Sequence, residues 1–481
     1  MQVQRSCFSS PNDTNGAIRH WLIYAIKLTY RYLNQICTHM KLILCFLFLS
    51  LTNCYAQQLA FPLKASENKK YIVDANNKPV FLKGCATWRI GYNVSIKEVR
   101  QFLADRKMKD YNTLLVQISP DNDGGGNVPN VYGERLFHGA DVSKPNEKFF
   151  LHVDSVLQVC NEMNFAVILF PLYLGCCNDG WLEILQQKPN DIQKIYNYGK
   201  WVANRYKKFP NLIWASGGDR HETPESLSFA KGVAETDNTH LHLYHTRAGS
   251  TSTERLPDEK WLTLSATYTY FPARDQNFNG PHVYTQLYEE GVRNHTIPHI
   301  MFESTYEYER GETTQMLRRQ AYWSVLGGSS GHLFGNRDLW RMNKNWPNAV
   351  NTPGNESMVI FHSFVNSIPW YQLQPDWMHT FFPSGRGTFN SGKYPGGEDY
   401  ATGAFTPDGA LGIIYLPTYR TVSVNLARFK GPVKAEWFDP SNGTYSSSTT
   451  FKNSGVAYLD PPSKLNGKGF DDWVLIVKKS D

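Results

Sequence analysis

The chain has few cysteines for its length, and none of them has the spacing of metal ligands. Eight occur among 481 residues. Four lie within the first 56 residues: Cys7, Cys37, Cys45 and Cys54. The other four are Cys85, Cys160, Cys176 and Cys177. So sparse a set excludes a disulfide-stabilised scaffold, although one disulfide of undetermined pairing stays open.

Charge and repetition are also scarce. Charged residues make up 19% of the chain, and no repeat of fixed period or long low-complexity segment occurs. The net charge of +6 is mainly N-terminal, because the first 56 residues hold five basic residues and one acidic residue, which leaves +2 for the rest. This balance gives no support for binding nucleic acid, and no such partner is expected.

Apolar and aromatic side chains are abundant. Apolar residues make up 41% and aromatic residues 14% of the chain, which is enough for a sizeable core and excludes a mainly disordered protein. The length predicts a large domain plus a smaller one. Aromatic rings line sugar sites as well as cores, so their number is only a hint of function.

The first 56 residues are predicted to be absent from the mature protein. Met40 and Lys41 precede an apolar run over 42–49, and small residues follow, which is typical of a signal peptide over 40–56 cleaved after Ala56. The run is too short to span a bilayer, so no membrane span is expected in the mature chain. Residues 1–39 are interpreted as a spurious extension. Lipid attachment at Cys54 is the alternative, and either case predicts a periplasmic, secreted or cell-surface protein.

Short apolar runs alternate with longer amphipathic segments through most of the chain. Eight runs are predicted strands: 80–85, 113–118, 166–171, 212–215, 241–245, 262–266, 299–303 and 331–334. Helices are predicted between them over 95–108, 149–164, 191–208, 225–235 and 314–326. Strands that are apolar throughout are buried on both faces. We therefore predict a closed (β/α)8 TIM barrel over 57–356.

The composition changes near residue 385. Glycine, serine, threonine and proline become frequent, and alternating strand-like pieces occur over 411–416, 421–426, 433–438 and 473–477. Turn-forming residues separate these pieces. The pattern predicts a small antiparallel β-sandwich over 385–481, joined to the barrel by a bridging segment over 357–384.

Two carboxyl groups are the candidate catalytic residues. In a TIM barrel, functional side chains lie at the carboxyl ends of the strands. Asp219 follows the fourth strand through two glycines, and Glu303 ends the seventh. Such a pair suits a general acid and a nucleophile for glycoside hydrolysis, although each can instead pair with a barrel arginine. We expect burial and the Glu303 charge to raise the pKa of Asp219, and Arg220 to oppose this if it faces the site.

Other side chains at the strand ends are candidates for binding a sugar. They are Trp88, Gln117, His245, Tyr268, Tyr270, Tyr306 and Trp340. Each aromatic ring among them can serve as a sugar platform or as packing at the rim. The histidines of the chain show no metal-ligand spacing, so neither a metal nor another cofactor is expected.

Two further motifs are excluded by their context. The segment 327–331 matches Gly-x-Ser-x-Gly, but a nucleophile elbow needs a strand before it and a helix after it, and here the predicted order is reversed. His221-Glu222 resembles the start of a zinc-protease helix, yet the second histidine is missing. Pro224 instead suits the first turn of a helix capped by Thr223.

Four segments carry a resemblance to a known family: 81–88, 213–219, 301–303 and 319–335. Through them the chain resembles the apiosidase-like glycoside hydrolases over nearly all of 65–481, and its tail is similar to a small domain with a collagen-binding label. The resemblance implies a plant-type polysaccharide or oligosaccharide substrate. It also implies a retaining mechanism with Asp219 as acid/base and Glu303 as nucleophile. Cys176-Cys177 and the stretch 268–281 depart from the family pattern, which leaves apiose specificity open.

The predicted function is an exported, metal-independent, retaining glycoside hydrolase. The alternative is a catalytically inactive barrel that binds glycans, and a transglycosylase or lyase would use the same cleft. Release of a sugar distinguishes the hydrolase from the inactive glycan-binding barrel. Whether water or a second sugar accepts the glycosyl group distinguishes the hydrolase from the third possibility. The C-terminal domain shows no obvious aromatic platform, which favours a stabilising role over polysaccharide binding.

Overall fold

The computed structural model describes residues 58–120, 127–175, 180–270, 282–293, 296–391 and 396–480. The predicted signal peptide, the preceding extension, Cys54 and the Cys176-Cys177 pair lie outside these residues. Cys85 and Cys160 are buried free thiols. Within the described parts of the chain, no helix is both long enough and apolar enough to cross a membrane.

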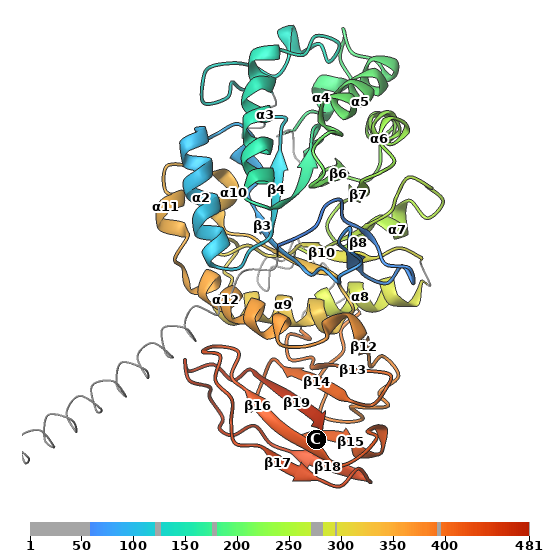
Figure 1. Cartoon of the computed structure of the whole chain (residues 1–481), viewed down its shortest axis with the longest axis vertical. Coiled ribbons are helices and arrows are strands. Elements are labelled where there is room, and N and C mark those ends of the chain that lie inside the picture. The colour runs from blue at the N-terminus through green and yellow to red at the C-terminus, as the bar shows by residue number, and fades with distance from the viewer. Residues whose placement is uncertain are drawn as a thin grey trace, which may run out of the picture. The chain divides into compact units, whose positions relative to one another are not determined.

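Eight parallel strands form the barrel that the sequence predicts, with helices around it (Figure 1). In the order of hydrogen bonding they are β7 (Leu241–His245), β6 (Leu212–Gly217), β5 (Ala166–Phe170), β4 (Thr113–Gln117), β3 (Leu82–Ala86), β11 (Gly331–Phe334), β10 (His299–Glu303) and β9 (Ser265–Tyr268). A short strand, β8 (Ser250–Thr251), pairs antiparallel with β9. Between β7 and β9, the N–H groups of Thr263 and Leu264 both donate to the His242 carbonyl, which closes the circle.

Helices follow most of the strands, and their starts agree with local sequence. The longer ones are α2 (Ile96–Met108), α3 (Glu147–Glu162), α5 (Ile192–Tyr206), α6 (Pro224–Thr236), α8 (Val283–Val292), α9 (Thr314–Leu326) and α12 (Pro353–Asn366). Short helices are α4 (Leu182–Leu185), α7 (Ser252–Arg255), α10 (Arg337–Arg341) and α11 (Trp346–Ala349). Thr223 caps α6, and Pro224 occupies its first turn, as predicted.

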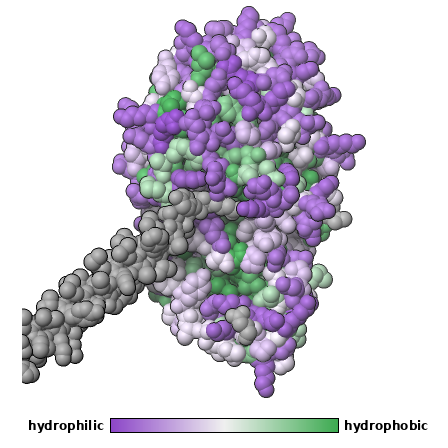
Figure 2. Space-filling view, in the orientation of Figure 1, coloured by the Kyte–Doolittle hydropathy of each residue, from purple (hydrophilic) through white to green (hydrophobic). Residues whose placement is uncertain are grey.

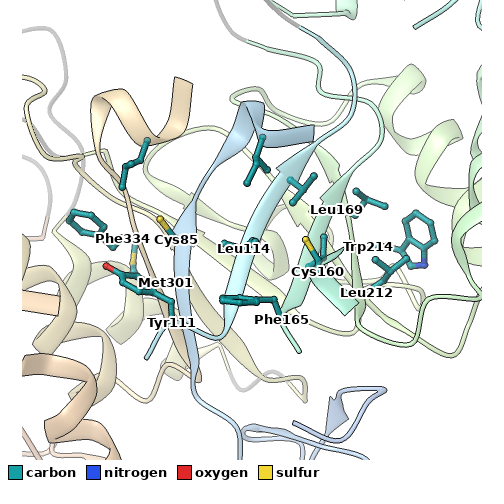
Figure 3. Packing of buried hydrophobic residues seen from close by; sticks show 14 of the residues in the cluster. Cys85, Tyr111, Leu114, Cys160, Phe165, Leu169, Leu212, Trp214, Met301 and Phe334 are labelled. Atoms are coloured by element: carbon teal, nitrogen blue, oxygen red, sulfur yellow. The ribbon is translucent and has the colours of Figure 1, made fainter. Parts of the chain in front are cut away.

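Side chains along each barrel strand alternate between two cores. One set fills the interior of the barrel: Leu115, Ile168, Ile213, Leu243, Ile300 and Leu333. The neighbouring residues pack outward beneath the helices, as Figure 3 shows for Leu114, Leu169, Trp214 and Met301. All residues of the eight parallel strands are buried. This burial on both faces explains why the strands read as continuous apolar runs.

The C-terminal part is an antiparallel β-sandwich. One sheet has the order β12 (Gln374–Pro375), β13 (Thr402–Phe405), β14 (Leu411–Leu416), β19 (Trp473–Lys479), β16 (Val433–Phe438) and β17 (Thr449–Phe451). The second sheet pairs β15 (Val422–Asn425) with β18 (Val456–Leu459). Apolar side chains from both sheets form the core between them.

The segment predicted as a bridge over 357–384 contributes to both parts of the chain. Helix α12 runs across the predicted boundary at 356/357. Strand β12 pairs with β13, and Phe381 and Phe382 are buried in the sandwich core. The structure therefore starts the C-terminal sheet before residue 385. Burying these apolar side chains in the sandwich core removes them from water, which stabilises this placement of the segment.

A buried ion pair joins the sandwich to the barrel. The Arg318 guanidinium on α9 donates to both carboxylate oxygens of Asp472, at 2.9 and 2.7 Å, and both side chains are fully buried. Nearby, the rings of Tyr322 and Tyr415 stack with centroids 4.9 Å apart. On the face shown in Figure 2 the outer surface of the barrel is mainly hydrophilic. Tyr322 and Tyr415 belong to the buried apolar cluster.

Candidate active site

Asp219 reaches the barrel mouth through a sharp turn at the end of β6. Gly217, Gly218 and Asp219 all have positive φ, at 89°, 125° and 42°. A Cβ on Gly217 would lie 2.2 Å from the His245 carbonyl oxygen, and one on Gly218 would lie 2.4 Å from the Tyr173 ring. Only glycine fits at these two positions, and aspartate tolerates the left-handed region better than most residues. Strained backbone of this kind is typical of functional sites.

Glu303 is directed to the mouth by a β-bulge. The pairing of β10 with β9 shifts register between Met301 and Glu303, so that β10 carries one extra residue there. A bulge can re-aim a side chain next to an active site. Consequently two consecutive residues face His245. The Phe302 ring lies 4.7 Å from the imidazole centroid, and Glu303 Oε2 lies 3.0 Å from His245 Nε2.

The two predicted catalytic carboxyl groups meet at His245. Its Nε2 atom lies 3.0 Å from Glu303 Oε2 and 3.6 Å from Asp219 Oδ1. One atom of each of these three residues lies within 4.8 Å of the others. The Tyr173 hydroxyl donates to Asp219 Oδ2 at 3.0 Å. Carboxylate oxygens and an imidazole also suit a divalent cation, so these three residues are where one would bind.

Burial shifts the pKa values of Glu303 and His245 in opposite directions. Burial raises the pKa of Glu303 to about 8, an effect that the Glu309 charge reinforces and the hydrogen bond from Tyr306 opposes. Burial also lowers the pKa of His245 to about 4, so the imidazole is neutral at pH 7. The Asp219 side chain is 21% exposed and that of Glu303 is 7% exposed. The stronger burial therefore lies on Glu303, whereas the sequence argument placed it on Asp219.

Arg220 does not counteract the charge of Asp219 directly. Its guanidinium donates to the Gly175 carbonyl and to Glu183 Oε1, the latter at 2.8 Å. The arginine thus holds the segment that follows β5 and the start of α4. Its side chain is engaged outside the Asp219–Glu303 pair.

An aromatic wall surrounds the carboxyl groups. Trp88, in the turn after β3, donates from Nε1 to the Tyr306 hydroxyl at 2.9 Å, and its ring lies 5.2 Å from that of Tyr173. The Tyr268 ring lies 4.8 Å from the imidazole of His245. Trp88, Tyr268 and Tyr306 are each less than 7% exposed. They form a buried wall of the site rather than an open platform.

Two of the predicted sugar-binding residues meet at the rim around a residue that sequence reasoning missed. The Tyr270 hydroxyl donates to Glu309, and Trp340 Nε1 donates to the same carboxylate at 2.7 Å. The Arg310 guanidinium lies 4.7 Å from the centre of the Tyr270 ring. Glu309 lies six residues beyond β10, where no strand or motif signalled it. Tyr173, the partner of Asp219, lies two residues after the predicted third strand. Functional side chains of a TIM barrel are expected at this position, so the sequence did offer a reason to consider Tyr173.

Gln117 is placed differently from the other predicted residues. Its side-chain amide donates to the Ser119 carbonyl at 2.6 Å, and the residue is buried. The amide therefore fixes the turn after β4, and no contact joins it to the carboxyl pair among the described residues.

The competing motifs have structural roles. Ser329 accepts a hydrogen bond from the Met301 N–H and donates to the Gly331 carbonyl, and its loop joins α9 to β11 in the order predicted. Glu222 is paired with Arg255. Neither motif contributes to the group formed by Asp219, His245 and Glu303.

Two carboxyl groups at the carboxyl ends of the strands of a TIM barrel can supply the acid and the nucleophile of glycoside hydrolysis. Residues 66–372 match the family model described as "Apiosidase-like, catalytic domain". Because this match covers more than half of the chain, the protein belongs to the apiosidase-like family, as its sequence motifs predicted. Residues 397–478 match a model described as "Putative collagen-binding domain of a collagenase".

Solved structures confirm the fold. One titled "Glycoside hydrolase" is 21% identical, with a TM-score of 0.74, and the match covers 88% of this chain and 97% of that chain. A glycoside hydrolase family 5 protein from Bacteroides vulgatus is 22% identical, with a TM-score of 0.73, and the match covers 87% and 93%. None of the curated proteins compared matches the chain. Family and fold together support a glycosidase function.

Proposed function

We propose that the protein hydrolyses glycosidic bonds in plant-type polysaccharides or oligosaccharides with retention of anomeric configuration. The observation that carries this proposal is the approach of Asp219 and Glu303, whose nearest carboxyl oxygens lie within 4.8 Å. Retaining enzymes separate their carboxyl groups by roughly 5–5.5 Å, and inverting enzymes by roughly 6.5–9.5 Å to admit a water molecule. The shorter separation supports direct attack by one carboxylate.

The two carboxyl groups share one proton near neutral pH. Glu303 has a pKa raised to about 8 by burial, and two carboxylates this close resist double ionisation. The reactive form carries the proton on Asp219 and the charge on Glu303. Burial opposes that distribution because it raises the pKa of Glu303, whereas the hydrogen bond from Tyr306 favours it because it stabilises the ionised carboxylate.

The reaction proceeds in two displacements. Asp219 gives its proton to the glycosidic oxygen as that C–O bond breaks, and Glu303 forms an ester bond with the anomeric carbon. Esterification removes the negative charge of Glu303, which lowers the pKa of Asp219 and converts it to a base. Asp219 then takes a proton from water as the water oxygen attacks the anomeric carbon, and Glu303 leaves as a carboxylate.

The surrounding residues are proposed to bind and orient the sugar. Trp88, Tyr268 and Tyr306 exclude water from the carboxyl pair, which strengthens electrostatic interactions there. Tyr270 and Trp340 meet the substrate at the rim, where Glu309 holds both. Neutral His245 positions Glu303. Gln117 supports the loop after β4.

The test is sugar release from a panel of pectic and hemicellulosic oligosaccharides by protein lacking residues 1–56. Release of one sugar by the wild type, and by neither Asp219→Ala nor Glu303→Ala, supports the proposal. Binding of an oligosaccharide without any product after long incubation would favour the alternative of an inactive glycan-binding barrel.

We also propose that the signal peptide over 40–56 exports the protein to the periplasm or cell surface. Sequencing the N-terminus of exported protein is expected to give Gln57 as the first residue. A lipid-modified N-terminus at Cys54 would instead establish a membrane-anchored form.

A further inference from the structure

A groove of about 740 Å³ lies at the end of the barrel opposite the catalytic carboxyl groups. Its lining includes His299 at the amino end of β10 and the 327–329 turn that precedes β11, whereas Asp219 and Glu303 follow the carboxyl ends of their strands. The C-terminal domain supplies β12 and the 407–408 turn. Figure 1 shows β12 beside α8 at this end of the barrel. The volume is within the range of small-molecule sites.

Four aromatic side chains line this groove: Tyr71, Trp370, Tyr371 and Trp377. The Tyr371 ring is 5.5 Å from that of Tyr71 and 6.0 Å from that of Trp370, and the residue is 36% exposed. Trp377 is held against α8, where its ring lies 5.4 Å from that of Tyr288. Rings fixed by their neighbours lose little conformational entropy when a ligand stacks on them.

Two lysines bring positive charge to the same groove. Lys69 and Lys70 stand in the turn between β1 (Lys64–Ala65) and β2 (Ile72–Val73). Ser66 fixes that turn, since its carbonyl accepts the Lys69 N–H at 2.8 Å and its hydroxyl accepts the Tyr71 N–H at 3.2 Å. Within the parts of the chain that the structure describes, neither ammonium group forms an ion pair.

The acidic residue in the lining, Asp408, forms no ion pair with these lysines among the described residues. Asp408 accepts hydrogen bonds from the Thr406 hydroxyl at 2.6 Å and from the Ala410 N–H at 3.0 Å, so its carboxylate is engaged in its own turn. The side-chain amides of Gln372 and Gln374 add neutral polar groups to the lining.

We propose that this groove binds an anionic oligosaccharide that carries uronic-acid carboxylates. The C–H faces of sugar rings stack on the aromatic side chains, the glutamine amides bond to hydroxyl groups, and the lysines pair with carboxylates. Binding here involves no covalent step and leaves the catalytic mouth free. The groove thus holds a polysaccharide to the enzyme through both domains. The choice of a saccharide as ligand rests on the proposed function.

The experiment is calorimetric titration of hexagalacturonic acid into the Glu303→Gln protein, which excludes turnover. Binding is expected, and adding Trp377→Ala or Tyr371→Ala is expected to weaken it about tenfold, because each substitution removes one stacking ring. A Lys69→Ala/Lys70→Ala pair is expected to weaken binding at low salt and to reduce its salt dependence. Tyr458→Ala, at an exposed tyrosine outside the groove lining, is the matched control and is expected to leave this affinity unchanged.

Three results would overturn the assignment: no binding of the hexasaccharide, equal affinity in all groove variants, or loss of affinity in the Tyr458→Ala control alone. Neutral galactohexaose bound as tightly as the acidic oligomer would refute the role of the lysines. Thermal melting of each variant verifies that it is folded. If Trp377→Ala fails to fold, Tyr371→Ala still tests the role of the aromatic rings. Because affinity is measured without catalysis, a lack of binding in the groove is distinguished from a lack of sugar hydrolysis by the wild type.

Discussion

Replacing Glu303 by glutamine is expected to stabilise the protein, and to do so more strongly as pH rises. Burial raises the pKa of this carboxyl from its ordinary value of 4.5 to about 8. Between these pH values the folded state holds a proton that the unfolded state releases, so unfolding becomes easier with each increase in pH. Below about pH 4.5 both states are protonated, and the penalty vanishes.

The magnitude follows from the interval of about 3.5 pH units. At about 1.4 kcal/mol per unit, ionised Glu303 costs the folded state up to about 5 kcal/mol above pH 8. Glutamine keeps the shape of the side chain and cannot ionise. The stability difference between Glu303→Gln and the wild type should therefore be small near pH 4.5 and reach several kcal/mol at pH 9.

The assay is thermal or urea unfolding of both proteins at pH 5, 7 and 9, with Glu67→Gln as a control at an exposed glutamate. The control is expected to follow the wild type at every pH. A stability difference between Glu303→Gln and the wild type that is the same at pH 5 and pH 9 would refute the reasoning, since it would show that Glu303 ionises normally in the folded protein.

Three other predictions follow from the site and the domain junction. The kcat/KM of the wild type should fall as pH rises through about 8, because the carboxyl pair then loses its shared proton; a rate that is flat from pH 7 to 9.5 would contradict this. His245→Ala should lower kcat by about 10²-fold with little change in KM, because the imidazole positions Glu303; kinetics on the panel substrate decide it, and wild-type kcat would exclude the role. Asp472→Asn should cost about 3–5 kcal/mol in unfolding experiments, because it leaves the Arg318 guanidinium buried without its counter-charge. Glu356→Gln, which removes an exposed ion pair with Lys468, should cost less than about 1 kcal/mol and serves as its control.

The sequence predicted the barrel and the meeting of its two carboxyl residues for a simple physical reason. Strands buried on both faces read as apolar runs, and eight such runs separated by helices leave few other folds. The carboxyl ends of parallel strands share one end of a barrel, so Asp219 and Glu303 had to lie at the same mouth.

The details of the site depend on three-dimensional contacts that a linear pattern does not carry. The bulge between Met301 and Glu303 depends on how β10 pairs with β9. The burial that raises the pKa of Glu303 depends on Trp88, Tyr306 and Phe302, which are distant in sequence or equally compatible with ordinary core packing. Glu309 follows a loop without any periodic pattern, so nothing marked it.

The elements inside the predicted bridging segment leave no mark in the composition. Helix α12 reads like any amphipathic helix, and strand β12 has only two residues. The aromatic residues of 370–377 line a groove only because the turn at 69–71 and the start of β10 lie beside them in the folded chain.

The most direct test of the mechanism is to trap the glycosyl-enzyme. Asp219→Ala removes the base of the second step, while an aryl glycoside of the sugar identified in the panel, with a good leaving group, needs no acid in the first. Mass spectrometry of this variant after mixing is expected to show the addition of one glycosyl unit, mapped to the peptide that contains Glu303. Release of a sugar of inverted configuration without any adduct, or an adduct on another residue, would contradict the account.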